Sequence, residues 1–152
     1  MAMLVLGCGN KPVENAINHD VAKHSPWVDV AHDLNVFPWP WGDNQFDVVQ
    51  AWAVLEHLRA DRLQIMNELW RILKPGGLAI IKLPAWDSDA AHDDITHYWF
   101  GSLHCMEQFD PTTERGRRYS FYTPCKWKLE EAKYSNTGHS SIYYKMRKVE
   151  NP

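Results

Sequence analysis

A short apolar run that ends in a glycine turn constrains this chain more than any other stretch. Residues 4–6 are followed at once by Gly7, Cys8, Gly9 and Asn10. Glycine allows a backbone with positive φ, and its missing Cβ lets a ligand approach closely. Such a turn at the carboxyl end of a first parallel strand is where α/β folds bind nucleotide-like ligands. An ordinary tight turn has the same Gly-x-Gly pattern, so the rest of the chain must support the ligand site.

Four later runs have the length and composition of strands. They cover residues 16–20, 28–32, 46–51 and 78–83. Asp20 closes the first of these runs, and Asp33 follows the second. The last run is apolar on both faces, as expected for a central strand of a parallel sheet. Because the carboxyl ends of parallel strands share one edge, Asp20 and Asp33 are expected near the glycine turn.

A helix is predicted between the last two of these runs. Asp61 and Gln64 form a capping box, and apolar residues recur at helical spacing as far as Leu73. A lysine, a proline and two glycines at residues 74–77 then end the helix. A shorter helix is predicted over residues 54–58.

The connections near the N-terminus are too short for packed helices. Only residues 7–15 separate the first two strands, and only residues 21–27 separate the next two. A crossover with a full helix needs a dozen residues or more. One face of the sheet is therefore expected to be covered by loops carrying Trp27, Trp39 and Trp41, or by a second subunit. This favours a homodimer.

The C-terminal part of the chain carries weaker signals. Residues 129–134 and 141–149, separated by a Ser-Asn-Thr-Gly turn, predict an antiparallel hairpin. Thr123 and Pro124 together predict the start of a helix. Residues 114–118 are highly charged and are expected to form a mobile loop.

Two motifs in the middle of the chain are specific. They are Leu-Glu-His at residues 55–57 and Leu-Lys-Pro-Gly-Gly at residues 73–77. With the strand pattern around them, residues 3–100 resemble the class I S-adenosylmethionine-dependent methyltransferases, in particular the small type 11-like group. The resemblance implies an α/β, Rossmann-like, mostly parallel twisted sheet that ends in an antiparallel hairpin, here with helices reduced on the N-terminal edge. We expect a single domain over residues 1–152.

The resemblance also implies S-adenosylmethionine as cofactor and assigns roles to the first turn. Gly7 and Gly9 would pack against its methionine and ribose portions, while Cys8 and Asn10 supply flanking contacts. Asp20 would accept hydrogen bonds from the ribose hydroxyls, as an acidic residue after the second strand does in dinucleotide folds. An exposed aspartate in a turn is the alternative for Asp20.

Further cofactor contacts are expected after the third and fourth strands. Asp33 would accept from the adenine amine while Leu34 packs on the ring, although Asp33 could instead be a simple cap. Gln50, Ala51 and Trp52 leave the fourth strand where the resemblance places the methyl-bearing end of the cofactor. Trp52 would face the sulfonium through a cation–π contact, which makes it a catalytic candidate as well, or else fill the core.

The other residues considered for catalysis come from two segments. Glu56 and His57 are adjacent on the predicted short helix and should point in different directions. The resemblance implies that this pair is mainly a structural signature, and a base role for His57, by position alone, is the alternative. Asp94, Thr96 and His97 match the segment that lines the acceptor pocket in similar methyltransferases. His97 is therefore predicted to line that pocket or to act as general base.

Two other functions stay open. A non-catalytic S-adenosylmethionine-binding subunit that needs a partner is suggested by the missing helices. A metal-dependent hydrolase is suggested by His92, Asp93, Asp94 and His97, whose spacing could bind zinc or iron. No distant motif completes such a site, so no metal is predicted.

Composition narrows the possible partners. The formal net charge of −3 gives no general attraction to nucleic acid or anionic membranes. Three cysteines without paired spacing and the lack of a membrane-length apolar stretch favour a reduced, cytoplasmic protein. Residues 115–118, next to Tyr119 and Phe121, could hold single-stranded nucleic acid or a small anion, or could be solvated. A small-molecule acceptor is favoured over nucleic acid.

Overall fold

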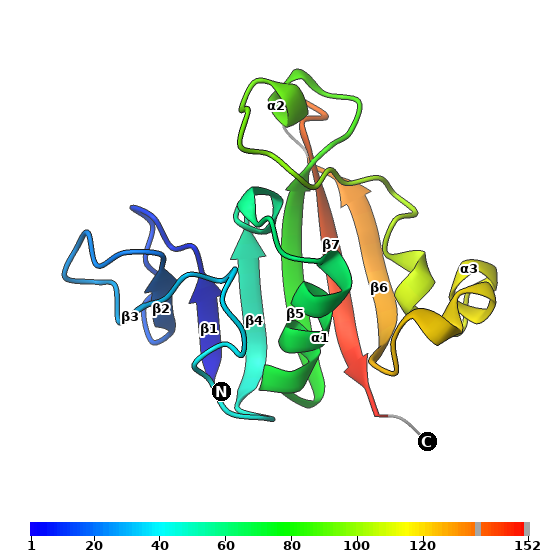
Figure 1. The fold of residues 1–152 in the computed structure, drawn as a ribbon, viewed down its shortest axis with the longest axis horizontal. Helices are drawn as coiled ribbons and strands as arrows, with labels where there is room; N and C mark the ends of the chain where they lie inside the picture. The colour runs from blue at the N-terminus through cyan, green and yellow to red at the C-terminus, as the bar shows by residue number, and fades with distance from the viewer. Residues whose placement is uncertain (136–137, 151–152) are drawn as a thin grey trace.

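A single mixed sheet organises the computed structural model, which describes residues 1–135 and 138–150 (Figure 1). Its strand order is β3-β2-β1-β4-β5-β7-β6, with β1 to β5 parallel and β7 antiparallel to both neighbours. This confirms the predicted mostly parallel sheet with a C-terminal hairpin. The strands are β1 (Met3–Leu6), β2 (Ile17–Asp20), β3 (Val30–Ala31), β4 (Phe46–Trp52), β5 (Leu73–Pro84), β6 (Lys126–Tyr134) and β7 (Ser141–Val149).

Helices are few in the described residues, and none lies between β1 and β2 or between β2 and β3. They are η1 (Leu55–His57), α1 (Arg62–Ile72), α2 (Asp89–His92), η2 (Glu107–Phe109), α3 (Glu114–Arg118) and η3 (Ser120–Tyr122). Within the part of the chain that the structure describes, no helix combines the length and apolarity that a membrane span requires. The short connections before β2 and β3 predicted this reduction of helices on the N-terminal edge, and the prediction is confirmed.

The predicted N-cap of the main helix is confirmed. Asp61 Oδ1 accepts the Gln64 N–H at 3.1 Å, and α1 follows as far as Ile72. Strand β5 then begins at Leu73, earlier than the predicted residue 78, because Leu73 is already extended and pairs with Phe46 of β4.

Three local predictions are wrong in detail. Thr123 does not start a helix, because it is extended and its hydroxyl donates to Asn67 Oδ1 at 2.6 Å, which directs the chain into β6. Residues 114–118 form α3 instead of a mobile loop, since Thr113 caps the Gly116 N–H at 2.8 Å. The predicted helix over residues 54–58 is only the 3-10 turn η1.

The main core lies between α1 and one face of the sheet. The buried face of α1 consists of Ile65, Met66, Leu69 and Ile72. Trp39 and Trp41, from the loop before β4, are buried in the same core with their rings 6.3 Å apart. Trp39 and Trp41 therefore cover this face beside β1. Coverage by loop tryptophans was one of the two expectations, and coverage by a second subunit was the other. Trp27 is different, because it stays 37% exposed and donates to the Gly9 carbonyl.

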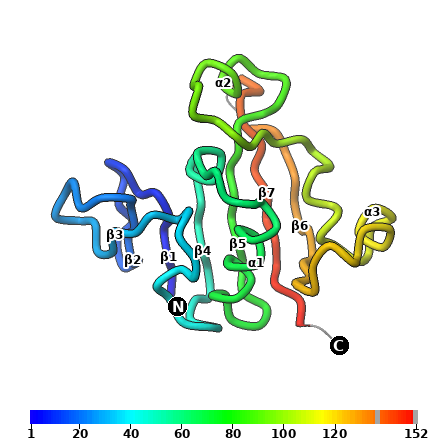
Figure 2. The backbone as a smooth tube through the Cα atoms, in the orientation of Figure 1, coloured from blue at the N-terminus to red at the C-terminus, as the bar shows by residue number. Residues whose placement is uncertain are grey.

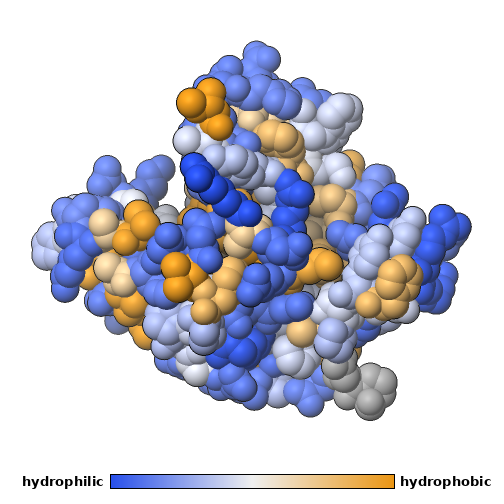
Figure 3. Space-filling view, in the orientation of Figure 1, coloured by the Kyte–Doolittle hydropathy of each residue, from blue (hydrophilic) through white to orange (hydrophobic). Residues whose placement is uncertain are grey.

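Apolar side chains remain on the surface where helices are missing. Figure 3 shows hydrophobic residues gathered on the side of β1, β2 and β3, within a face that is otherwise largely hydrophilic. Val21 and Val36, in the loops after β2 and β3, are both more than half exposed. The expected homodimer stays a prediction.

The tryptophan loop is held to α1 by Arg71 and Glu68 of that helix, and Arg71 also pairs with Asp43 of the loop at 2.8 Å. Arg71 donates to the carbonyls of Trp39 and Trp41 at 3.2 and 2.8 Å and pairs with Glu68 at 2.7 Å. Glu68 in turn accepts the Trp39 N–H at 2.7 Å. A proline-rich loop cannot satisfy its backbone groups through a helix, so this pair supplies their partners.

Replacing Arg71 with Met should therefore destabilise the protein. The substitution leaves two loop carbonyls without this donor and Glu68 without its charged partner, at a cost of about 1–3 kcal/mol in the free energy of unfolding. Urea unfolding followed by tryptophan fluorescence measures it. The exposed Arg118→Met control should change the free energy by less than about 0.5 kcal/mol. Equal effects of the two substitutions would contradict the anchoring role.

Candidate functional site

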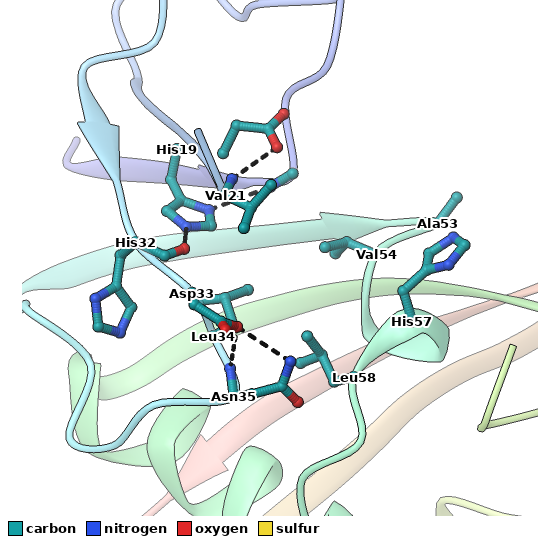
Figure 4. A pocket seen from close by; sticks show the side chains of 12 residues that line it. His19, Val21, His32, Asp33, Leu34, Asn35, Ala53, Val54, His57 and Leu58 are labelled. Atoms are coloured by element: carbon teal, nitrogen blue, oxygen red, sulfur yellow. Dashed lines mark hydrogen bonds between the residues drawn. The ribbon is translucent and has the colours of Figure 1, made fainter. Parts of the chain in front are cut away.

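A cavity of about 380 Å³ lies at the carboxyl edge of the sheet (Figure 4). Segments that follow β1, β2, β3 and β4 meet there, although they are far apart in the sequence. Its volume falls within the range of small-molecule sites. The lining consists of Gly7, His19, Asp20, Val21, His32, Asp33, Leu34, Asn35, Ala53, Val54, His57 and Leu58.

The glycine turn after β1 packs directly against the segment after β4. Gly7 has φ +62°, and a Cβ placed on it would lie 2.7 Å from Val54 Cγ2. Both the backbone conformation and the space therefore require glycine there. Gly9 also has positive φ, but a Cβ on it would meet nothing within 4 Å among the described residues.

His19, which the sequence analysis missed, joins the first three strands. Its Nδ1 accepts the Gly7 N–H at 3.3 Å, and its Nε2–H donates to the His32 carbonyl at 2.8 Å. Burial lowers the pKa of His19, so the ring that makes this bridge is neutral. A polar residue at a buried position of a short strand was the available signal for such a bridge.

Asp20 presents an ionised carboxylate to the cavity. Its oxygens accept the Gly9 N–H at 2.8 Å and the Val21 N–H at 2.7 Å, and His24 lies 3.3 Å away. Burial acts to raise the pKa of Asp20, but these hydrogen bonds outweigh it and hold the pKa below its ordinary value. The carboxylate thus supports the glycine turn as well as lining the site.

The loop after β3 forms a second polar wall. Asp33 Oδ1 accepts from the Asn35 backbone and side chain at 2.9 and 3.0 Å. Asn35 Oδ1 accepts the Arg59 N–H at 2.7 Å, which connects this loop to the segment after η1. Leu34 is buried between them, and its carbonyl accepts from the Trp39 indole at 3.0 Å. Asn35 was not among the predicted site residues.

The structure brings Gly7, Asp20, Asp33 and Leu34 together, but six other predicted cofactor residues do not line this cavity. They are Cys8, Gly9, Asn10, Gln50, Ala51 and Trp52. Cys8 packs in a small separate cluster with Val28, and Ala51 is fully buried in the main core. The Trp52 ring lines another cavity, where it packs edge-on against Tyr143 at 5.8 Å.

Glu56 and His57 do not diverge as their positions on a helix predicted. In the tight turn η1, ligand atoms of both residues lie within 4.8 Å of each other and of one from His97. Glu56 is 2% exposed, and its Oε2 has no hydrogen-bond partner within the described residues. Burial raises the pKa of Glu56 to about 7.

The segment after β5 folds over this turn beyond the carboxyl end of the strand (Figure 2). His97 is half-buried, with its Nδ1 3.1 Å from the Ala91 carbonyl and its ring 4.8 Å from that of His57. His97 does not line the first cavity, but His57 does. His97, the predicted base, therefore lies behind His57 and does not itself line the cavity.

The metal cluster considered for the hydrolase hypothesis is not assembled. His92 Nε2 lies 3.1 Å from the Trp86 carbonyl, and its ring packs against Phe100 at 5.2 Å. Among the described residues, the candidate metal-ligand group contains His97 but neither His92 nor the aspartates at 93 and 94. Close spacing in sequence misled here, because the turn after α2 separates the side chains.

Comparison with known proteins places this geometry in context. A methyltransferase domain family matches residues 10–81. A probable S-adenosylmethionine-dependent methyltransferase of Mycolicibacterium smegmatis is 37% identical over 71 residues, or 47% of this chain and 26% of that protein. The resemblance to class I S-adenosylmethionine-dependent methyltransferases is confirmed.

Two further proteins resemble this methyltransferase-like chain over more of its length. The tRNA N(3)-cytidine methyltransferase METTL2 of Gallus gallus is 26% identical over 113 residues, or 73% of this chain and 28% of that protein. A chain of the solved complex between the Haloferax volcanii Trm112 methyltransferase activator and a methyltransferase has a TM-score of 0.65 at 12% identity, covering 98% of this chain and 83% of that one. The chain thus spans about a quarter of the length of the two curated relatives, and the solved structure shows the fold alone.

The two glycines of the first turn should differ in how they tolerate alanine. Gly9→Ala should cost about 1–2 kcal/mol, for the left-handed backbone only. Gly7→Ala should cost about 1–3 kcal/mol more, because its methyl group would overlap Val54. Urea unfolding measures both, and equal costs would contradict the close packing of Gly7.

His19 should make the methyltransferase-like fold less stable in mild acid. Its pKa is lowered in the folded state, so below the unfolded value of about 6.5 only the unfolded chain binds the proton. The raised pKa of Glu56 acts in the opposite direction over the same pH range, but it is common to wild type and variant. From about pH 7.5 to pH 5.5 the wild type should therefore lose free energy of unfolding relative to His19→Gln. Glutamine can still accept from Gly7 and donate to His32. The exposed His104→Gln control should follow the wild type, and a His19→Gln slope equal to wild type would refute the assignment.

Proposed function

We propose that this chain binds S-adenosylmethionine in the first cavity and transfers its methyl group to a small-molecule acceptor. One observation carries the proposal: Gly7, the ionised Asp20 and the Asp33 loop converge on one cavity at the carboxyl edge of a methyltransferase-type sheet. Open α/β sheets bind ligands at this edge, where the order of the strands reverses. Here that reversal lies between β1 and β4.

Each part of the cofactor then has a partner in the cavity. The two oxygens of Asp20 each hold one backbone N–H, which leaves lone pairs for the two ribose hydroxyls. Asn35 occupies Oδ1 of Asp33, so we assign Oδ2 to the adenine amine. The side chain of Leu34 packs on the adenine ring. Trp52 has no part in this proposal, because its ring lies in the other cavity.

Methyl transfer from a sulfonium is a displacement that depends mainly on alignment of the acceptor with the methyl group, and proximity supplies much of the acceleration. We place the acceptor beside His57, a lining residue in the turn after β4, with His97 behind it. A base at this position matters only for an acceptor that must lose a proton.

A small molecule suits the site better than nucleic acid. The arginines of α3 are the basic cluster considered for nucleic acid, and α3 packs beside β6, at the other end of the sheet from β2 and β3 (Figure 1). None of these arginines lines the cavity. The tRNA specificity of the Gallus gallus relative is the competing proposal for the acceptor.

A second possibility is a cofactor-binding subunit that is active only with a partner. The missing helices favour it, because loops and not helices connect β1, β2 and β3. The solved complex with the Trm112 activator shows that a protein of similar fold occurs with a partner. Cofactor binding without methyl transfer by the purified chain would support this alternative.

Calorimetric titration with S-adenosylmethionine and S-adenosylhomocysteine tests the proposed site. Asp20→Asn should weaken both affinities about 10–100-fold, because a charged hydrogen-bond acceptor is lost. Asp93→Asn, an exposed aspartate outside the cavity lining, is the matched control and should bind normally. Wild-type affinity in a folded Asp20→Asn variant would remove the cofactor from this cavity.

The acceptor class is tested by transfer of a radiolabelled methyl group. Pools of small metabolites and total tRNA are offered separately to the purified chain. Label in a small molecule supports the proposal, and label in tRNA alone would overturn the choice of acceptor without affecting the cofactor site.

A further inference from the structure

We infer that Glu56, His57 and His97 form a binding site for a divalent transition-metal ion at the edge of the first cavity. Each residue offers one ligand atom, and the three atoms lie within 4.8 Å of one another. Two residues come from the turn after β4, and the third comes from the segment after β5, 40 positions later. Two imidazoles and one carboxylate are a ligand set that Zn²⁺ and Fe²⁺ bind well.

The carboxylate of Glu56 is the strongest indication of a missing ligand. The residue is 2% exposed, and its Oε2 has no hydrogen-bond partner within the described residues. A buried polar atom without a partner costs free energy, and a buried carboxylate is normally paired or bound to a metal. One ring nitrogen of each histidine lies within 4.8 Å of an oxygen of this carboxylate.

The hydrogen bonds around His57 prepare it to bind a metal. Asp94 Oδ1 accepts the Thr96 hydroxyl proton at 2.6 Å. Because the only hydroxyl proton of Thr96 is used in that hydrogen bond, the Thr96 oxygen can only accept from His57 Nδ1, which lies 2.8 Å away. His57 therefore carries its proton on Nδ1 and presents the lone pair of Nε2. Metal-binding histidines are oriented in this way by acceptors behind them.

His97 is oriented by the same principle. Its Nδ1 lies 3.1 Å from the Ala91 carbonyl, which can only accept, so this nitrogen carries the proton. Nε2 then carries the lone pair that a metal would use, with Asp94 Oδ2 3.8 Å from it. Two independent acceptors, a threonine hydroxyl and a backbone carbonyl, thus set the same tautomer in two neighbouring histidines.

The geometry needs only a small adjustment. Ligand atoms in a tetrahedral zinc site are about 3.3 Å apart, given metal–nitrogen bonds of about 2.0–2.1 Å. His57 is exposed and can move toward the buried Glu56. Three protein ligands leave at least one coordination position open, as in catalytic zinc sites. Because His57 also lines the cavity, we place that open position toward the acceptor, a detail that rests on the proposed function.

Metal titration of the full chain tests this inference. After chelator treatment, calorimetry with ZnCl₂ should show one ion per chain, and CoCl₂ should give d–d absorption bands of a low-coordinate site. Glu56→Gln and His97→Ala should each weaken Zn²⁺ binding more than about 100-fold, since loss of a ligand exceeds loss of an outer partner. Thr96→Val should weaken it about 10–100-fold.

His92→Ala is the matched control, because His92 lies outside the ligand group and should leave the affinity unchanged. Circular dichroism and thermal melts establish that each variant is folded. Should wild-type Zn²⁺ affinity persist in folded Glu56→Gln and His97→Ala, the inference is wrong. Loss of binding in His92→Ala alone would likewise overturn it, in favour of a site on that histidine.

The metal site and the cofactor site can fail separately. Zn²⁺ binding is measured without S-adenosylmethionine, and cofactor binding is measured in the presence of chelator. Ligand-dependent Zn²⁺ binding without cofactor binding supports the metal site and overturns the proposed function. Cofactor binding with no Zn²⁺ uptake does the reverse.

Discussion

The contact between Gly7 and Val54 joins the two strands on which the site depends. Strands β1 and β4 are paired in parallel, so the turns at their carboxyl ends lie side by side, and only glycine fits between them. His19 extends the connection to β2 and β3 through hydrogen bonds with Gly7 and His32. A neutral ring is needed because it must accept on one side and donate on the other. The cavity is thus built by backbone packing before any ligand enters.

A loop anchored by polar side chains replaces the missing helices on this edge. Trp39 and Trp41 fill the core where helical side chains would otherwise lie, and the pair of Glu68 and Arg71 satisfies their backbone groups. The same loop supports the site, because the Trp39 indole donates to the carbonyl of Leu34. Stability of the N-terminal edge and shape of the cavity are therefore coupled through one helix, α1.

Two carboxyl groups near the site have opposite environments. Hydrogen bonds from backbone N–H groups outweigh burial and lower the pKa of Asp20. For Glu56 burial outweighs the single backbone hydrogen bond and raises the pKa to about 7. The difference follows from position: Asp20 closes a strand beside the glycine turn, whereas Glu56 points into a turn covered by the segment of His97. The first suits a fixed acceptor for neutral hydroxyls, and the second suits a ligand for a cation.

The amino-acid sequence alone determined the features that depend on neighbours in the chain: the cap at Asp61, the strand periodicity, the final hairpin and the glycine turn. It also indicated that Asp20 and Asp33 would share an edge, since parallel strands end together. Only the tertiary structure decided that Trp52 faces the other cavity and that Glu56, His57 and His97 converge. Those outcomes depend on the twist of the sheet and on contacts between residues 40 positions apart, which no local pattern encodes.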